Sequence, residues 1–206
     1  KRQIEDTVMA QLTGEQRKLY LANQDRIAQQ VQHREASEFK KDKLKVLAEL
    51  TKLRQICCDP HLHYADYKAG SAKLDTCMEL VHGALDGGHR ILLFSQFTGM
   101  LDIIGKRLAK EDIAFLKLTG ASSKESRAKM VAQFQAGEVP VFLISLKAGG
   151  VGLNLTAADV VIHYDPWWNV AAQDQATDRA HRIGQQHTVT VYKLLSLIHI
   201  SEPTRP

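Results

Sequence analysis

The chain has 206 residues, enough for one substantial hydrophobic core or for one core with an appendage. Its 44% hydrophobic and 24% charged residues are ordinary for a globular protein, and no apolar run approaches the roughly 20 residues that span a membrane. The charged start KRQIED does not match a signal peptide. The formal net charge of +4 permits an anionic partner without requiring one.

Residues 1–70 are expected to be helical and extended. Thr13 and Gln16 have the spacing of a capping box, which predicts that a polar helix starts there. A second helix is predicted before Pro60, with one buried apolar stripe that needs another element to pack on: Leu44, Leu47, Leu50, Leu53 and Ile56.

The stretch CCDPHLH, residues 57–63, places two cysteines close to two histidines. A metal site is one interpretation, but the spacing matches no zinc pattern. We therefore expect small thiols packed beneath a turn at Pro60, and reduced cysteines in a cytosolic protein.

Short apolar runs alternate with helical stretches after Ser71, which is expected to cap a helix that stops at Gly87. Strands are predicted at 90–94, 113–118, 141–145, 160–164 and 189–195. Helices are predicted over 100–108, from Ser122 and over about 170–183. The second of these helices is expected to be capped by Ser122, with Glu125 three residues further on. The strand runs are continuously apolar, as expected for strands buried on both faces. The sequence predicts an open α/β domain over 71–195, with a parallel sheet covered by helices on both faces.

Such sheets bind ligands beyond the carboxyl ends of their strands. One loop at that edge, SLKAGGVGLNL, contains Gly149, Gly150 and Gly152 and follows a buried strand. Glycines let a backbone approach an anion closely, and Ser145 and Lys147 add donors, so this loop is predicted to contact phosphate or nucleic acid. A tight turn is the alternative. The chain has neither the GxxxxGK[ST] nor the GxGxxG phosphate motif.

Two adjacent tryptophans, Trp167 and Trp168, follow another predicted strand in DPWWN. Two neighbouring side chains cannot both point into one core, so at least one is expected at a surface or an interface. Stacking on nucleic acid and packing alone are both open interpretations.

The stretch DRAHRIGQ places two arginines on a predicted helix, where Gln175, Arg179 and Arg182 fall on one face at i, i+4 and i+7. Planar guanidinium groups suit a triphosphate. In the simpler interpretation Asp178 only pairs with Arg182 along the helix, which contributes a few tenths of a kcal/mol.

Three stretches, ILLFSQFTGML, SLKAGGVGLNLTAADVVIHYDPWWN and QATDRAHRIGQ, resemble successive motifs of the C-terminal lobe of Swi/Snf-related DNA translocases of helicase superfamily two. The preceding LTKLRQICCDP also resembles this family, so the likeness covers about residues 44–195. Asp178 stands where strand-separating relatives have glycine, whereas Val170 departs from the proline that many relatives carry.

The resemblance implies a two-lobed motor that binds ATP between RecA-like domains. Arg179 and Arg182 then correspond to arginine fingers, with Gln175 and Gly152 also at the nucleotide. Double-stranded DNA would contact Ser95, Gln96, Thr119, Gly120, Arg127, Ser145, Lys147, Gly149 and Trp168. Mg²⁺ would be held mainly by a first lobe, whose phosphate-binding motif this chain lacks, so the chain alone is expected to be inactive.

Residues 1–70 correspond to the inter-lobe segment in this comparison, and 71–195 to the C-terminal lobe. Residues 196–206 resemble a non-native tail and are expected to pack poorly. The implied location is cytoplasmic and nucleoid-associated in a bacterium, which is favoured, or nuclear in a eukaryote. No membrane is involved, the remodelled cargo is open, and the alternatives are a strand-separating or RNA-directed helicase lobe and a non-catalytic nucleic-acid-binding module.

Overall fold

The computed structural model describes residues 2–33, 39–150, 153–166, 170–180 and 186–198. The chain divides into two compact units. The larger comprises Lys1–Met9 and Thr76–Leu195, and the smaller comprises Ala10–Asp75 and Ser196–Pro206.

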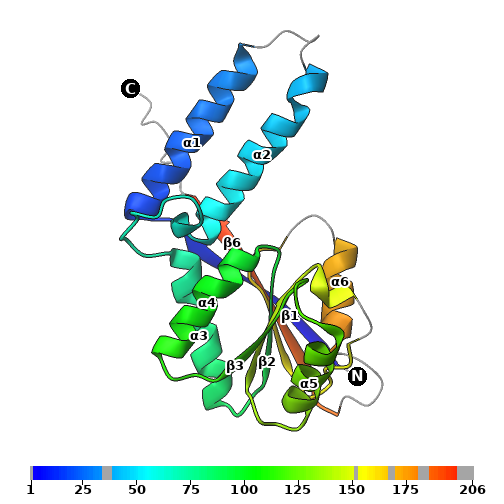
Figure 1. The fold of residues 1–206 in the computed structure, drawn as a ribbon. Coiled ribbons are helices and arrows are strands. Elements are labelled where there is room, and N and C mark those ends of the chain that lie inside the picture. The colour runs from blue at the N-terminus through cyan, green and yellow to red at the C-terminus, as the bar shows by residue number, and fades with distance from the viewer. Residues whose placement is uncertain (1, 34–38, 151–152, 167–169, 181–185, 199–206) are drawn as a thin grey trace. The chain divides into compact units, whose positions relative to one another are not determined.

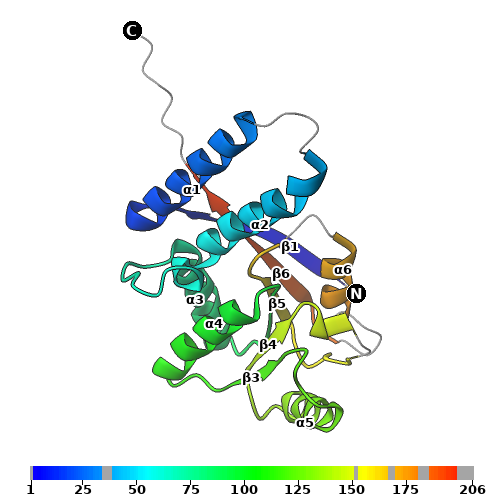
Figure 2. The same ribbon diagram turned by 45° about the horizontal axis from the view of Figure 1, so that its top comes forward.

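A six-stranded parallel sheet forms the centre of the larger unit, in the order β1-β6-β5-β2-β4-β3 (Figure 1). In Figure 2 the labels β1, β6, β5, β4 and β3 follow this order across the sheet. The strands are β1 (Gln3–Gln11), β2 (Ile91–Ser95), β3 (Phe115–Leu118), β4 (Val141–Ser145), β5 (Val160–His163) and β6 (Val189–Leu197). The predicted fold class is confirmed.

Two neighbouring interior strands, β2 and β4, are apolar except for the serine that ends each of them, because both of their faces are covered. Every residue of β2 and β4 is buried, and Ile91 pairs with Val141 while Ser95 pairs with Ser145. Burial of such strands on both sides contributes roughly 25 cal/mol for each Å² of apolar surface removed from water. The continuous apolar runs of the sequence therefore identify the middle of the sheet.

Helices cover both faces of the sheet, with α3 (Ala72–Asp86) and α4 (Thr98–Lys110) on one side and α5 (Lys124–Gln135) and α6 (Val170–Asp178) on the other (Figure 1). Successive strand residues point to opposite faces. Phe94 and Ile144 therefore pack in the cluster that contains Phe134 of α5 and Ala176 of α6. Leu143 points the other way, toward Gly105 of α4.

Two strand segments differ from the prediction. β1 lies at the edge of the sheet, in a segment expected to be helical or extended, and most of its side chains are exposed. An edge strand needs no continuous apolar pattern, which explains why the sequence did not indicate it. β6 continues through Ser196 and Leu197, and the Leu197 carbonyl accepts a hydrogen bond from the Leu12 amide at 2.9 Å. The segment that was expected to pack poorly therefore begins with two residues of β6, of which Ser196 is half-buried and Leu197 is exposed.

The smaller unit contains two long helices, α1 (Gly14–Gln32) and α2 (Phe39–Cys58). The Thr13 side chain makes no capping hydrogen bond, so the predicted capping box does not form. The side chain of the buried Gln16 forms other hydrogen bonds. Its Nε2 donates to the carbonyls of Ile56 and Cys57 at 3.0 and 3.3 Å, and its Oε1 accepts from the backbone amide of Ala72 at 3.1 Å. Long-range contacts take the place of the local cap.

The apolar stripe of α2 is buried only at its carboxyl end. Leu53 and Ile56 are 8% and 0% exposed, whereas Leu44 is 78% exposed and Leu47 and Leu50 are also exposed. The prediction of a fully buried stripe is therefore wrong for the first three leucines.

A short 3₁₀ helix, η1 (Pro60–Leu62), follows α2, and the Asp59 carboxylate caps it by accepting from the His61 amide at 2.8 Å. Cys58 and Cys77 are buried, and burial raises the pKa of the Cys57 thiol. Within the described residues no group of three or more His, Cys, Asp and Glu is arranged to hold a metal ion. No helix in the same residues is long and apolar enough to cross a membrane.

Two helix starts were predicted to be capped by serine. Ser71 caps α3 as expected, because its hydroxyl accepts from the Leu74 amide at 3.3 Å and donates to the Cys58 carbonyl at 2.7 Å. The cap of α5 is Ser123, one residue later than predicted, and it accepts from the Ser126 amide at 3.1 Å. Ser122 instead accepts from the Thr119 amide and closes the preceding loop.

Candidate functional site

The carboxyl edge of the sheet contains a switch point, between β2 and β5, where the chain connections diverge. After β2 the chain passes through α4 to β3, and after the neighbouring β5 it passes through α6 to β6, on the opposite side. Open α/β sheets bind ligands at such a switch point. Because all the strands are parallel, the loops that follow β2, β3, β4 and β5 all start at this edge.

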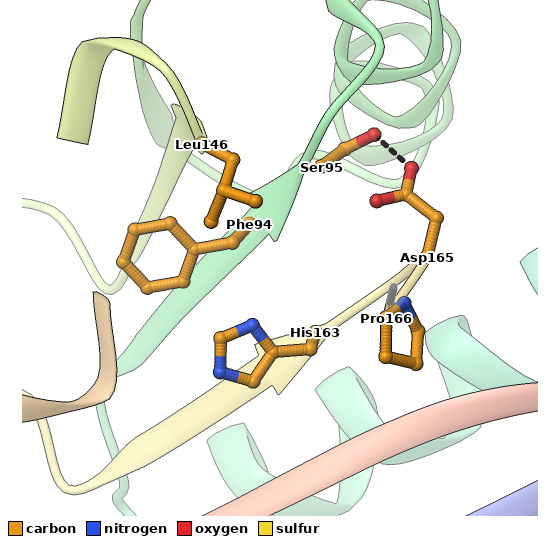
Figure 3. Close-up of a pocket in the computed structure, with 6 residues that line it drawn as sticks. All are labelled: Phe94, Ser95, Leu146, His163, Asp165 and Pro166. Carbon is orange, nitrogen blue, oxygen red and sulfur yellow. Dashed lines mark hydrogen bonds between the residues drawn. The ribbon is translucent and has the colours of Figure 1, made fainter. Parts of the chain in front are cut away.

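Asp165 ties the loops after β2 and β5 together (Figure 3). Its carboxylate accepts from the Ser95 hydroxyl at 2.5 Å and from the Gln96 amide at 2.9 Å, while the Gln96 side chain donates to the Asp165 carbonyl at 2.9 Å. Ser95 is 1% exposed, so its hydroxyl shapes the loop from inside and does not face solvent. Gln96 is half-buried, and its side-chain amide points toward the loop that follows β5.

The space between these strands is filled. Phe94, Leu146, His163 and Pro166 line a hollow beside the Ser95–Asp165 hydrogen bond that leaves no room for a water molecule (Figure 3). The described part of the switch point is therefore a packed hinge between two loops, and any ligand would bind above it.

The glycine loop after β4 is also held from inside. The buried Ser145 hydroxyl accepts from the Ala148 amide at 3.2 Å and so caps the turn η2 (Ala148–Gly150). A Cβ at Gly149 would meet Phe94 at 3.6 Å and the Nε of Arg179 at 3.9 Å. Lys147 is exposed and extends from the same turn.

The loop after β3 contains Thr119 and Gly120, and Gly120 is exposed. The half-buried Arg127 of α5 bends back onto this loop, donating to the carbonyls of Ser122 and Thr119 at 3.2 and 3.4 Å. Arg127 thus fixes the shape of the loop, and its side chain also lines a surface groove with Lys124 of the same helix.

Helix α6 differs from the predicted one. It ends at Asp178, and the Arg179 and Ala180 amides then bond to the carbonyls three residues earlier. Gln175 is exposed, whereas Arg179 is 1% exposed, so these side chains do not share an accessible helix face. The helix predicted over 170–183 is therefore too long. Gly152, Trp168 and Arg182 lie outside the described residues.

Two buried polar residues of this region were not among the predicted site residues. His163, the last residue of β5, is 2% exposed, and its Nε2 lies 2.9 Å from the Thr177 hydroxyl of α6. Burial lowers the pKa of His163 to about 4, helped by the Lys193 charge and opposed by Glu5. The sequence signal that could have identified His163 is a titratable residue inside the apolar run VVIHY.

An open parallel sheet covered by helices on both faces, with a switch point and a glycine turn at its carboxyl edge, defines a RecA-like α/β lobe. The chain belongs to the family described as the helicase conserved C-terminal domain, whose model matches residues 72–184, more than half of the chain, and it is of the SWI2/SNF2 type.

Curated relatives agree with this assignment. An "uncharacterized ATP-dependent helicase" of Mycoplasma pneumoniae is 38% identical over 201 residues, covering 97% of this chain and 19% of the relative. The "chromatin-remodeling ATPase INO80" of Aspergillus oryzae is 46% identical over 136 residues, covering 66% of this chain and 9% of the relative. The chain thus spans a fifth or less of the length of these relatives.

Solved structures share the fold. The SWI2/SNF2 ATPase core of Sulfolobus solfataricus in complex with double-stranded DNA has a TM-score of 0.82 and 36% identity, covering 95% of this chain and 41% of that chain. The C-terminal domain of a SWI2/SNF2 ATPase from the same organism has a TM-score of 0.78 and 34% identity, covering 95% of this chain and 80% of that one.

Proposed function

We propose that the chain is the second lobe of an ATP-dependent translocase that moves along double-stranded DNA without separating its strands. The observation that carries this proposal is the switch-point edge, where one aspartate joins the Ser95–Gln96 loop to the segment that leads into α6. A neighbour of 36% identity whose structure contains double-stranded DNA supports the choice of substrate.

The DNA side consists of the loops after β2, β3 and β4. Gln96, Gly120 and Lys147 are the accessible members, and the backbone amides of these loops would donate to phosphate oxygens. Three other predicted contact residues form hydrogen bonds within these loops and so hold their shape: Ser95, Ser145 and Arg127. The absence of a side chain at Gly149 lets the turn lie close to Phe94. Thr119 and Trp168 complete the proposed contacts. Phosphate contacts predict binding that is independent of sequence and weakens with salt.

The ATP side consists of the region around α6. Gln175 is exposed there, and we assign nucleotide contact to Gln175, Gly152 and Arg182. Arg179 is buried against the glycine turn in this lobe, so a role as a second finger requires a rearrangement that exposes its guanidinium. An arginine finger accelerates phosphoryl transfer by roughly 10³–10⁵-fold.

ATP bound between two lobes would supply the closing and opening that moves the DNA. We assign the phosphate-gripping motif and most of the Mg²⁺ coordination to a first lobe of the full-length protein. The chain printed above has no GxxxxGK[ST] motif, and we expect it to be inactive when separated from that lobe.

The test compares ATP hydrolysis by the full-length protein with and without duplex DNA. Arg182→Ala is expected to reduce the DNA-stimulated rate by about a thousandfold while DNA binding is retained. The control, Arg107→Ala, removes an arginine of α4 that pairs at 3.7 Å with Glu111, and should leave the rate unchanged.

Other outcomes would reject parts of the proposal. Unwinding of the duplex would identify a strand-separating helicase, and stimulation by RNA alone an RNA-directed one. DNA binding without any ATP hydrolysis would identify a non-catalytic module. Normal hydrolysis by Arg182→Ala would show that this arginine is a surface charge.

A further inference from the structure

A buried histidine connects the two sides of the proposed site. His163 closes β5 with its ring stacked on Phe94 of β2, the ring centroids 5.6 Å apart and the planes at 21°. Its Nε2 lies 2.9 Å from the Thr177 hydroxyl. The first three residues of β5 are apolar, so a phenylalanine would fill the same volume without desolvating a polar ring. The hydrogen bond to Thr177 compensates for that desolvation.

Thr177 lies on α6 between Gln175 and Arg179. The other buried residues of this segment are Ala176, at 3% exposure, Ala180, at 0%, and Arg179, at 1%, which follows the end of α6. The two methyl groups set how closely the helix approaches the sheet, but they constrain its rotation and axial position weakly. A hydrogen bond is directional, so the contact between His163 and Thr177 constrains both from within the helix itself.

The same end of β5 also holds the proposed DNA loop. Asp165, two residues after His163, binds the Ser95 hydroxyl and the Gln96 amide. Phe94, on which His163 stacks, immediately precedes Ser95 and would contact a Cβ at Gly149. Buried hydrogen bonds and a ring contact thus connect the β2 loop to the end of β5, and the end of β5 to α6.

We propose that His163 is a positioning residue which, through its hydrogen bond to Thr177, sets α6 relative to the Ser95–Gln96 loop and so couples DNA contact to ATP turnover. This inference rests on the proposed function. The low pKa of His163, about 4, keeps its imidazole neutral at physiological pH, and in a neutral imidazole one ring nitrogen donates and the other accepts. Lys193 on β6 and Glu5 on β1 are the charged groups that act on it.

The test uses three variants of the full-length protein. His163→Phe keeps the stacking and removes the hydrogen bond, Thr177→Val removes the hydroxyl at constant shape, and Thr177→Ser retains it. We expect His163→Phe and Thr177→Val each to reduce the DNA-stimulated kcat by about tenfold with an unchanged KM for ATP and an unchanged rate without DNA. Thr177→Ser should stay within about twofold of wild type.

The double variant should lose no more than either single variant, because both remove one interaction. Additive losses would overturn the proposal. Equal losses with and without DNA, or a Thr177→Ser variant as impaired as Thr177→Val, would overturn it as well, since either result describes a general packing defect.

Hydrogen exchange of the α6 amides in the same proteins separates this inference from the proposed function. Thr177→Val should accelerate exchange in α6 by about tenfold and leave α5 unchanged, and Thr177→Ser should not. If the wild type lacks DNA-stimulated hydrolysis but the exchange result holds, the proposed function fails while the positioning role stands. Unchanged exchange in α6 would refute that role whatever the enzymatic result.

Discussion

Arg90 offers a test of what holds α5 against the sheet. This half-buried residue immediately precedes β2, and its Nη2 donates to the carbonyl of Phe134, near the end of α5, and to that of Val139, in the connection to β4. The guanidinium also lies 4.3 Å from the centroid of the Phe134 ring, and burial lowers its pKa. Arg90→Met preserves the apolar stem and removes all of these polar contacts.

Hydrogen bonds to a charged group contribute about 1.5–3 kcal/mol, and a cation–π contact about 0.5–1 kcal/mol where it is exposed. Arg90 is partly exposed, and water replaces some of these contacts in the variant. We therefore expect Arg90→Met to lower the free energy of unfolding by about 2 kcal/mol. The matched control, Arg107→Met, removes a partly exposed ion pair to Glu111 at 3.7 Å and should cost less than about 0.5 kcal/mol.

Urea unfolding followed by hydrogen exchange of the β2 and β4 amides measures this difference, because those amides report the larger unit. Arg90 lies at the amino edge of the sheet, away from the loops of the candidate site, so DNA-stimulated ATP hydrolysis of the full-length Arg90→Met protein should be preserved at low temperature. Equal unfolding free energies for the two arginine variants would refute the reasoning.

Two further predictions concern helix capping and pH. Ser123→Ala should cost about 1 kcal/mol because the hydroxyl caps α5, whereas Thr13→Ala should cost under about 0.5 kcal/mol because Thr13 makes no cap bond; thermal unfolding of both variants checks this, and equal losses would contradict it. His163 is harder to protonate in the folded state, with a pKa of about 4, than in the unfolded chain, at about 6.5, so protons favour unfolding between these values. From pH 6.5 down to 4 the wild type should lose up to about 3 kcal/mol more than His163→Phe, and parallel stability–pH curves for the two proteins would show that His163 is not the group responsible.

The sequence predicted the middle of this fold well and its margins poorly. β2 and β4 are buried on both faces, so their first four residues are apolar, and the serine that ends each strand is buried with a hydrogen-bond partner. β1 is an edge strand with exposed, mixed side chains, which satisfy the same sheet without a recognisable pattern. The predicted caps at Thr13 and Ser122 are not formed, because the side chains involved have other partners in the folded chain. Gln16 donates to the Ile56 carbonyl, and Ser122 accepts from the Thr119 amide.

The location of the candidate site follows from topology, but the orientation of its side chains does not. Alternating strands and helices place residues 95–96, 119–120 and 145–149 at one edge, and this much was predictable. Ser95 and Ser145 are polar residues at strand ends, yet both are buried and hydrogen-bonded inside the protein. The partner of Ser95 is Asp165, 70 residues away, whereas Ser145 bonds locally to the Ala148 amide. A polar residue in a functional loop therefore serves either the ligand or the loop, and sequence spacing alone does not distinguish these roles.

Arg179 shows the consequence for mechanism. Helical spacing placed it beside Gln175 and Arg182, on the assumption that the helix continues to residue 183. The helix ends at Asp178, and the turn that follows carries Arg179 into the interior beside Gly149, while Gln175 remains exposed. A guanidinium in that position lies beside the glycine turn and is closed off from solvent. A role for Arg179 at ATP would therefore require the side chain to leave this position, which would link nucleotide binding to the loop after β4 that is proposed to contact DNA.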